Sequence, residues 1–187
     1  MFDVGAHIGL VTMPMSKAMA PGGKIYAFEP ATANLQTLKN HMALNNIENV
    51  TIVHSLVGNS VRDRVTFYES PSISGMNTCA PIKNSRQYNQ TIQQQTSLDK
   101  FCLKYRLQPH IIKVDVEGFE LAVLEGAKEL LTSIKPKIFL SVHPQHLAAL
   151  GRSPEELTAF LSEMDYTISD MDGKKIDRFT LNEYLLT

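Results

Sequence analysis

The chain opens with Met1-Phe2-Asp3-Val4-Gly5-Ala6-His7-Ile8-Gly9, in which a short apolar run surrounds an acid and precedes two glycines. The apolar residues predict a strand, and the glycines predict a sharp turn into a helix beyond Gly9. Gly5 has no Cβ, so a ligand can approach its backbone closely, and Gly9 allows the helix to pack tightly on the strand. In an open α/β sheet, nucleotide-like ligands bind at such a turn, at the carboxyl end of the first strand. We therefore expect a mostly parallel, doubly wound α/β sheet whose ligand site lies at this turn.

The spacing of the glycines restricts the ligand. A dinucleotide fingerprint, Gly-x-Gly-x-x-Gly, has a glycine where this chain carries His7, whose side chain would crowd a diphosphate. The chain also lacks the Gly-Lys-Ser/Thr of a nucleoside triphosphate loop. The remaining pattern, Asp-x-Gly-x-x-x-Gly, suits an adenosyl ligand without phosphates, such as S-adenosylmethionine. An NAD-dependent oxidoreductase and a plain strand-to-helix turn without a ligand stay as alternatives.

Length and composition indicate a single domain over residues 1–187, because 187 residues suffice for one substantial core. The net charge of −1 gives no reason to expect a nucleic-acid or membrane partner. Cys79 and Cys102 form neither a disulfide framework nor a zinc pattern, so we expect free thiols in a reducing compartment. The sequence contains no transmembrane run and no signal peptide, and we expect a cytoplasmic protein. The first strand, which is central in a doubly wound sheet, has barely begun where the sequence starts. Either Met1 is an internal methionine of a longer natural chain, which we favour, or the domain lacks a preceding cap.

Strand and helix patterns alternate along the chain, as in a sheet with parallel strands and right-handed crossovers. We expect strands at residues 24–28, 50–54, 111–115 and 137–142, and closing strands at residues 166–170 and 183–187. We expect helices at residues 10–20, 31–45, 97–105 and 120–131, and a further helix from Ser153. Two strands at residues 64–69 and 91–96 favour an antiparallel hairpin. The polar stretch Ser70–Gln90 between them is either a lid over the ligand site or a solvated connection.

Polar side chains stand at the ends of four predicted strands, namely Asp3, Glu29, Asp115 with Glu117, and His143. Because the carboxyl ends of parallel strands line one crevice, we expect these residues to lie close together. Glu29 follows the glycine turn by about 20 residues, the distance at which an acid accepts hydrogen bonds from ribose hydroxyls. An acid that stabilises a helix N-terminus is the alternative interpretation of Glu29.

Three acids, Asp115, Glu117 and Glu120, stand at one predicted strand-to-helix turn. Such crowding is unfavourable unless cations, hydrogen bonds or protonation relieve it, so these carboxylates are site candidates. A turn cap for Asp115, a helix start for Glu120 and a magnesium site are the alternatives. No second acid cluster completes a magnesium site in the sequence, and we expect no metal. His143 differs from the other histidines by its place in the predicted crevice, and the near-neutral pKa of imidazole suits a proton acceptor.

These motifs together carry a resemblance to a known family. The motifs are Asp3–Gly9, Phe28-Glu29-Pro30, Ser97-Leu98-Asp99, Ile112–Glu120, Leu124–Ala127 and Val142-His143-Pro144. With them, the chain resembles the FkbM family of S-adenosylmethionine-dependent methyltransferases over nearly its whole length. The resemblance implies a Rossmann-like class I methyltransferase fold with a C-terminal antiparallel strand, and S-adenosyl-L-methionine as cofactor. It implies cofactor contacts at Asp3, Gly5, Ala6, His7, Gly9, Glu29, Leu56, Val57 and Asp115.

The resemblance also implies methyl transfer to a hydroxyl of a sugar or secondary metabolite, that is, of a small-molecule or glycan acceptor. We expect direct displacement, in which the protein positions the reactants and removes the hydroxyl proton. His143 is the predicted base, and Asp115 and Glu117 would orient the acceptor or the cofactor amine. A degenerate domain that binds without catalysis is the alternative, and the possibility of a homo-oligomer stays open. Loops select methyl acceptors, so no sequence pattern identifies the acceptor itself.

Overall fold

The computed structural model describes residues 1–80 and 88–187, and within these ranges it contains a seven-stranded sheet and a three-stranded sheet. The strands of the larger sheet are, in spatial order, β3 (Val50–Val53), β2 (Ile25–Phe28), β1 (Phe2–Val4), β7 (Ile111–Val114), β8 (Lys137–Val142), β10 (Asn182–Leu186) and β9 (Ile168–Asp170). From β3 to β8 every neighbouring pair is parallel, whereas β10 is antiparallel to both β8 and β9. The expected doubly wound sheet with a C-terminal antiparallel strand is therefore confirmed.

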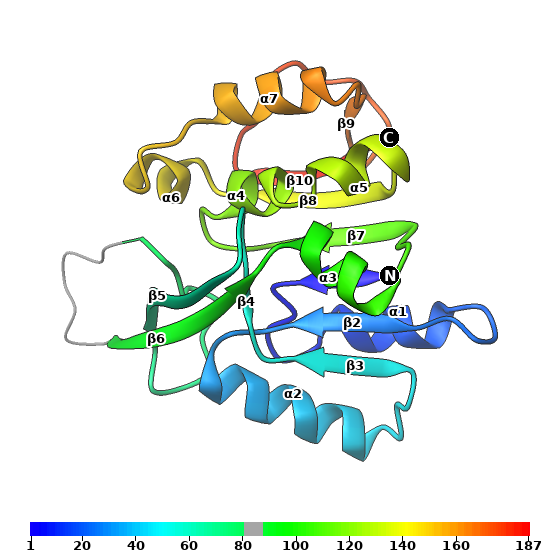
Figure 1. Cartoon of the computed structure of the whole chain (residues 1–187), viewed down its shortest axis with the longest axis vertical. Coiled ribbons are helices and arrows are strands. Elements are labelled where there is room, and N and C mark those ends of the chain that lie inside the picture. The colour runs from blue at the N-terminus through cyan, green and yellow to red at the C-terminus, as the bar shows by residue number, and fades with distance from the viewer. Residues whose placement is uncertain (81–87) are drawn as a thin grey trace.

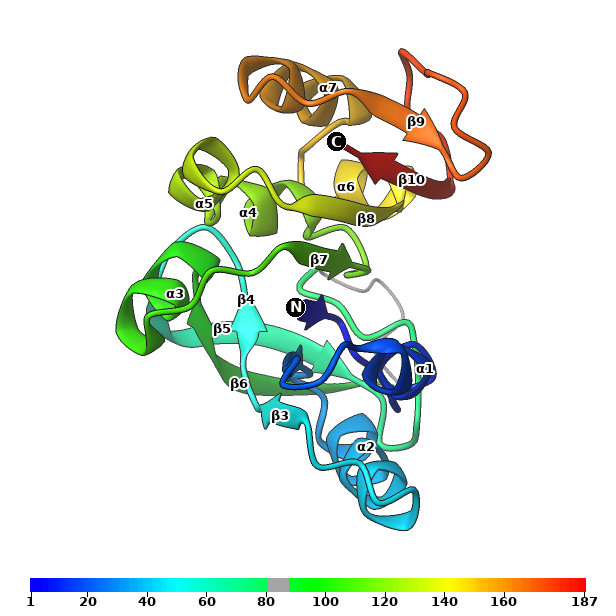
Figure 2. The ribbon, with the colours of Figure 1, turned by 90° about the vertical axis from the view of Figure 1, so that its right-hand side faces the viewer.

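Helices cover both faces of this sheet. They are α1 (Thr12–Ala18), α2 (Thr32–Leu44), α3 (Leu98–Tyr105), α4 (Glu120–Glu125), α5 (Lys128–Ser133), α6 (Pro144–Ala149) and α7 (Pro154–Glu163). Helices α1 and α2 lie on one face, and α3, α4 and α5 lie on the opposite face (Figure 2). Among the residues that the structure describes, no helix is long and apolar enough to cross a membrane.

The main core forms where the central strands meet α3, α4 and α5. Phe2 of β1 and Ile112 of β7 are at most 1% exposed, as expected for strands that are covered on both faces. The ring of Phe2 lies 5.7 Å from that of Phe28 and 5.9 Å from that of Phe101 of α3, in edge-to-face arrangements. Such burial stabilises the fold by about 1.5–3 kcal/mol for each large side chain. The core thereby fixes the positions at which the strands end.

The three-stranded sheet consists of β4 (Leu56–Val57), β6 (Asn89–Thr96) and β5 (Arg62–Glu69), in that order. The expected hairpin is confirmed, since β5 and β6 are antiparallel. The arrowheads of β2 and β3 point toward this small sheet (Figure 1). Glu69 at the end of β5 accepts a hydrogen bond from Thr32 N at 2.7 Å, which joins the small sheet to the start of α2. The small sheet therefore stands at the carboxyl edge of the parallel strands.

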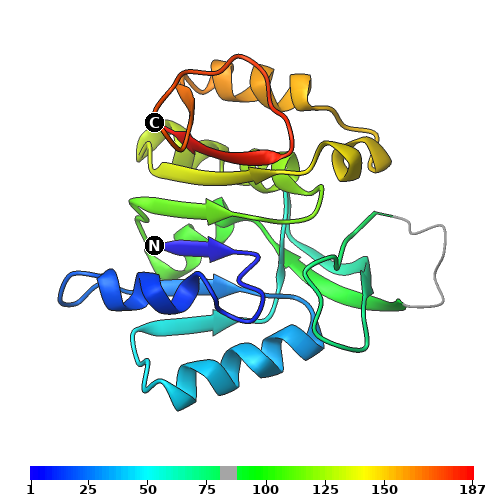
Figure 3. The same cartoon turned by 180° about the vertical axis from the view of Figure 1, so that it is seen from behind.

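The polar stretch after β5 is only partly described. Of the predicted lid Ser70–Gln90, residues 81–87 lie outside the described residues. Within the described part, Thr78 forms an isolated antiparallel bridge with Tyr68 of β5. Figure 3 shows this segment at the carboxyl end of the strands, beside the start of α2. The residues before the gap are therefore tied to the fold by backbone hydrogen bonds.

The prediction of one helix over residues 120–131 is wrong, because α4 and α5 are separate helices. At the break between the two helices, the backbone amide of Asp99 in α3 donates a hydrogen bond to Gly126 O at 2.9 Å. The Asp99 carboxylate accepts from Glu129 N at 3.0 Å and from Leu130 N at 2.9 Å. It thereby satisfies free amides in the first turn of α5. These contacts with α3 divide the helix, and the apolar periodicity does not reveal them.

Two short elements, β4 and α6, are not predicted from the sequence. Leu56 and Val57 of β4 pair in parallel with Gln95 and Thr96 of β6. Helix α6 begins at Pro144, and proline suits the first turn of a helix because its missing N–H would have no partner there. With two and six residues, both elements are too short for a periodic pattern. Both nevertheless border the candidate site.

Candidate functional site

A cleft, called the main cleft below, lies at the carboxyl ends of the strands β1, β2 and β7. The predicted site residues that line it are Gly5, His7, Glu29, Leu56, Val57, Asp115 and Glu117. Asp3, Ala6 and Gly9, for which cofactor contacts are also predicted, are not among its lining residues in the described part of the chain. The structure thus gathers residues from the β1 turn, the β2 end, β4 and the β7 end around one cavity.

The glycine turn after β1 has the strained backbone that its sequence suggests. Gly5, His7 and Gly9 all have positive φ angles, of 80°, 52° and 89°. A Cβ on Gly5 would lie 1.9 Å from Asp115 O, so the backbone that ends β7 occupies the space beside Gly5. A Cβ on Gly9 would lie 2.7 Å from Leu38 Cδ1 of α2. The missing Cβ of Gly5 therefore lets the end of β7 pack against the turn. The missing Cβ of Gly9 makes room for α2, and not for the packing of α1 on β1 that the sequence suggested.

Asp3 supports this turn from within the core. Its side chain is fully buried, and Oδ2 accepts from Thr12 Oγ1 at 2.6 Å. Lys113 Nζ lies 3.2 Å from Asp3 Oδ1, donates to Gly5 O at 2.8 Å and lies 3.5 Å from Asp115 Oδ2. The cation of Lys113 thus links the β1 turn to the end of β7. Sequence reasoning missed Lys113 and Thr12, although a lysine inside an apolar strand was a signal for Lys113.

Glu29 lies at the end of β2, is 4% exposed and lines the main cleft. One carboxylate oxygen accepts from His7 N at 2.8 Å, and the other accepts from Ala31 N at 2.9 Å and from Asn34 Nδ2 at 3.3 Å. Burial raises the pKa of Glu29 to about 7, and these three hydrogen bonds oppose the rise. The bond from Ala31 N at the start of α2 fits the helix-start interpretation, and the place in the cleft fits the ligand interpretation.

The remaining walls of the main cleft differ in character. Leu56, Val57 and Phe67 form an apolar wall, and they are 6%, 4% and 3% exposed. On another side, residues 74, 75, 77, 78 and 79 line the cavity. Thr78 of this segment donates through Oγ1 to Glu117 O at 2.9 Å. The cleft therefore offers both an apolar surface and hydrogen-bonding groups.

A second cleft, called the side cleft below, adjoins the main cleft. It is lined by Asp115, Glu117, Ser141, Val142, His143, Leu181, Asn182 and Glu183, from the ends of β7 and β8 and the start of β10. Asp115 and Glu117 line both clefts. The predicted acids therefore stand at the junction of two cavities, and the predicted base stands in the side cleft.

His143 is held between three carboxylates. Its Nδ1 lies 2.7 Å from Glu120 Oε1, and its Nε2 lies 3.6 Å from Glu117 Oε1 and 3.8 Å from Asp115 Oδ1. Glu120 is fully buried, so it holds the imidazole from the side away from the clefts. The hydrogen bond to Glu120 raises the pKa of His143, burial opposes the rise, and the other carboxylates support it. Sequence reasoning left the role of Glu120 open between site and helix start.

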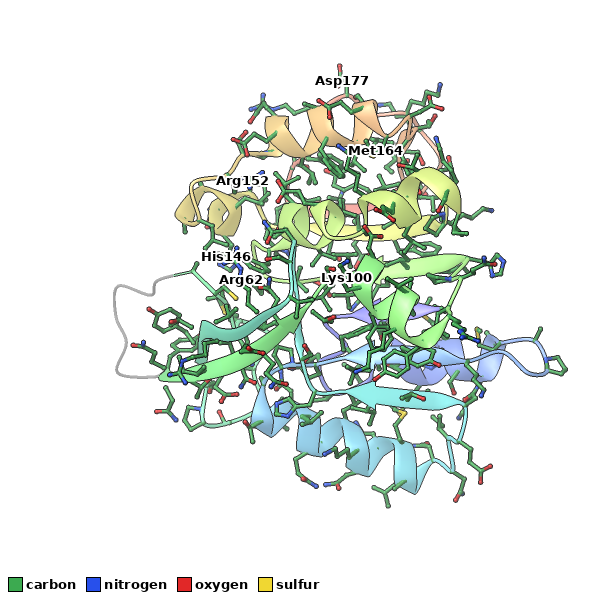
Figure 4. The ribbon with its side chains drawn as sticks, in the orientation of Figure 1. Arg62, Lys100, His146, Arg152, Met164 and Asp177 are labelled. Atoms are coloured by element: carbon green, nitrogen blue, oxygen red, sulfur yellow. The ribbon has the colours of Figure 1, made fainter. Side chains whose placement is uncertain are left out.

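His146, which Figure 4 labels, lies on α6 and belongs to the same cluster. Its Nδ1 lies 2.6 Å from Glu117 Oε2, and its ring stacks on that of His143 with centroids 6.0 Å apart. From the sequence, His143 was the only histidine placed in the site. His146 was missed because its position depends on α6, which the sequence does not predict. Within residues 1–80 and 88–187, no group of three or more His, Cys, Asp or Glu side chains has an arrangement that could hold a metal ion.

The mostly parallel sheet with its C-terminal antiparallel strand is the class I methyltransferase fold, which solved structures share with this chain. Methyltransferase FkbM from Methylobacillus flagellatus KT superposes with a TM-score of 0.64 at 23% identity, over 99% of this chain and 42% of that chain. A Streptococcus mutans protein in complex with SAH superposes with a TM-score of 0.55 at 13% identity, over 99% of this chain and 84% of that chain. Residues 3–168 match the Methyltransferase FkbM domain, and the chain therefore belongs to this family.

Two curated relatives are also named methyltransferases. Methyltransferase sdnD from Sordaria araneosa is 27% identical over 156 residues, which cover 68% of this chain and 60% of the relative. Methyltransferase 1 from Beauveria bassiana (strain ARSEF 2860) is 31% identical over 144 residues, which cover 66% of this chain and 56% of the relative. The chain thus matches little more than half the length of these relatives.

Proposed function

We propose that the chain binds S-adenosylmethionine in the main cleft and methylates a hydroxyl of a small-molecule or glycan acceptor in the side cleft. The observation that carries this proposal is the junction of the two clefts at Asp115 and Glu117. A transfer reaction needs two reactants in contact, and effective positioning of such reactants lowers the barrier substantially. Two cavities that share two carboxylates provide this arrangement, with an acid suited to ribose at one end and an imidazole at the other.

The residues of the main cleft fit an adenosyl cofactor. Glu29 has a carboxylate on the cavity wall that can accept hydrogen bonds from ribose hydroxyls, and Leu56 with Val57 offers an apolar surface for adenine. His7 lines the cleft, and within the described residues its Nε2 is a buried atom without a hydrogen-bond partner. A bound ligand would supply such a partner. The complex of the Streptococcus mutans protein with SAH supports the same cofactor for this fold.

The residues at the junction would orient the reacting ends of both ligands. S-adenosylmethionine, when bound, supplies a methyl group activated by a sulfonium. The side chain of Asp115 is 41% exposed and faces both cavities, so it can accept a hydrogen bond from the cofactor amine. The side chain of Glu117 is 19% exposed and can accept one from the acceptor. Lys113 lies 3.5 Å from Asp115 Oδ2 and holds this carboxylate toward the β1 turn.

His143 provides the proton acceptor of the proposed reaction. If Nδ1 donates its hydrogen to Glu120 Oε1 at 2.7 Å, Nε2 keeps a lone pair toward the side cleft. Nε2 can then accept the proton of an acceptor hydroxyl in the side cleft, and the cofactor, when bound, would supply the methyl group and leave as S-adenosylhomocysteine. The carboxylates of Asp115 and Glu117, at 3.8 and 3.6 Å from Nε2, stabilise the imidazolium that forms. Glu120 is a positioning residue, because it acts on the reaction only through His143.

Calorimetric titration with S-adenosylmethionine, with NAD as the matched control, tests the proposal. Micromolar binding of S-adenosylmethionine without binding of NAD supports it, and transfer of a labelled methyl group to a panel of sugars and polyhydroxylated metabolites completes the test. Binding of S-adenosylmethionine without transfer to any acceptor would favour the degenerate binding domain. Binding of NAD alone would favour the oxidoreductase, and binding of neither would overturn the proposal.

A further inference from the structure

Asn34, in the first turn of α2, is 2% exposed and lines the main cleft. Its side-chain amide forms hydrogen bonds with two separate parts of this cleft, Ser74 and Glu29. Its Nδ2 donates to Ser74 O at 2.9 Å, and its Oδ1 accepts from Ser74 N at 3.1 Å. The same Nδ2 donates to Glu29 Oε1 at 3.3 Å. One buried amide therefore connects the cleft acid to both backbone groups of a residue in the segment after β5.

The segment Ser74–Thr78 is anchored at both ends beside reacting groups. At one end Ser74 is bonded to Asn34, and at the other end Thr78 Oγ1 donates to Glu117 O at 2.9 Å. Residues 74, 75, 77 and 78 line the main cleft between these anchors. Figure 3 shows this part of the chain passing beside the start of α2 at the carboxyl edge of the sheet. The segment therefore spans from the cofactor acid to the junction of the two clefts.

We propose that Asn34 is a positioning residue that couples cofactor binding at Glu29 to the placement of the segment Ser74–Thr78. This inference rests on the proposed function, because it takes the ligand of Glu29 to be S-adenosylmethionine. Three hydrogen bonds already orient the Glu29 carboxylate, one of them from Asn34. A ligand that donates to this carboxylate would restrict it further, and with it the amide of Asn34. The Asn34 amide in turn fixes the position of Ser74 through hydrogen bonds with both its N and its O. Cofactor binding would thus hold in place the part of the wall that the acceptor meets near Glu117.

The amide of asparagine is the group that this connection requires. A carboxylate at position 34 would accept from Ser74 N but would repel Glu29 and could not donate to Ser74 O. An alanine would remove all three hydrogen bonds of the Asn34 side chain, and Glu29 Oε1 would keep only the one from Ala31 N. Ser74 is only half-buried, so water can replace the bonds that it loses, and the segment would separate from α2 without a large loss of core packing. The fold can therefore survive a change that removes the coupling.

Hydrogen exchange of the backbone amides of residues 72–78, with and without S-adenosylmethionine, tests the inference on the purified chain. In the wild type we expect the cofactor to slow exchange at these amides and at the β1 turn. In Asn34→Ala we expect cofactor affinity to fall about tenfold, as for the loss of one hydrogen bond to a charged group. We also expect protection by the cofactor to persist at the β1 turn and to vanish at residues 72–78. Asn40→Ala is the matched control, because Asn40 is an exposed asparagine on the same helix.

The possible outcomes separate this inference from the proposed function. A wild type that fails to bind S-adenosylmethionine overturns both. A wild type that binds it, together with an Asn34→Ala variant that keeps full cofactor-dependent protection at residues 72–78, overturns the role of Asn34 alone. If Asn34→Ala does not fold by circular dichroism, Asn34→Leu takes its place in the same comparison, because leucine has a similar size and forms no hydrogen bond. A merely structural role would lower the melting temperature but would leave the difference in exchange between free and bound protein unchanged.

Discussion

Glu120 Oε1 lies 2.7 Å from His143 Nδ1, and this contact joins the first residue of α4 to the residue that follows β8. Glu120 is fully buried, and its Oε1 also accepts from Gly118 N at 3.2 Å, so the carboxylate is held in place. A histidine whose one ring nitrogen is bound in this way presents its other nitrogen in a fixed direction. In this protein that direction leads to the carboxylates at the junction of the two clefts.

Replacing His143 should abolish most of the turnover without weakening the binding of the cofactor. In His143→Ala we expect kcat to fall by about 100-fold or more, the usual effect of losing a general base. We expect the Kd of S-adenosylmethionine to stay within about twofold, because His143 lines only the side cleft. Single-turnover methyl transfer and calorimetry measure the two quantities. His110→Ala, at an exposed position, is the control, and equal turnover in the two variants would remove His143 from the mechanism.

The pH profile of the reaction should report the bond between Glu120 and His143. Only the unprotonated imidazole can accept the hydroxyl proton, so kcat/KM should rise with pH through the pKa of His143. The bond to Glu120 raises this pKa above the ordinary value for histidine. In Glu120→Gln the negative charge is lost, and we expect the midpoint of the rise to move to lower pH while maximal turnover falls. An unchanged midpoint would show that Glu120 does not act through the base.

Sequence patterns predicted the strand ends well, because strands that are buried on both faces form continuous apolar runs. The runs that contain Ile25–Phe28 and Ile111–Val114 each end at an acid, and the parallel sheet brings both acids to one cleft. The positions of Glu29, Asp115 and His143 around joined clefts thus follow from chain order and sheet geometry alone. The chemical roles of these residues stay predictions.

The partners of buried polar groups could not be predicted in the same way. Lys113 donates a hydrogen bond to Gly5 O, which is 108 residues away in the sequence. Asn34 donates one to Ser74 O, which is 40 residues away. These contacts depend on strand register and on the path of an irregular segment, and neither leaves a periodic signal in the sequence. The lysine within an apolar strand was the one visible sign. It indicated a buried partner without identifying it.

Removing the cation of Lys113 should destabilise the fold as a whole. Lys113→Met leaves the fully buried Asp3 with a hydrogen bond from Thr12 but without its counter-charge. Breaking one partner of a buried ion pair costs about 3–5 kcal/mol, and we expect the free energy of unfolding in urea to fall by that amount. Lys104→Met is the control, because Lys104 is exposed on α3. A loss below about 1 kcal/mol would show that the cation of Lys113 is not needed to keep Asp3 buried.

Cofactor affinity should depend on pH through Glu29. Burial raises the pKa of this carboxyl to about 7, so near neutral pH a large share of the free protein carries it protonated. Ribose hydroxyls donate more strongly to the charged form, and binding of S-adenosylmethionine is then coupled to release of a proton. We expect affinity to fall by up to about tenfold for each pH unit below 7 and to level off above 8.

Glu29→Gln cannot titrate, so it should bind S-adenosylmethionine more weakly at pH 8 and lose the part of the pH dependence that belongs to this group. Calorimetry at pH 6, 7 and 8 on both proteins measures the difference. Parallel pH dependences would exclude Glu29 as the group that accepts from the cofactor.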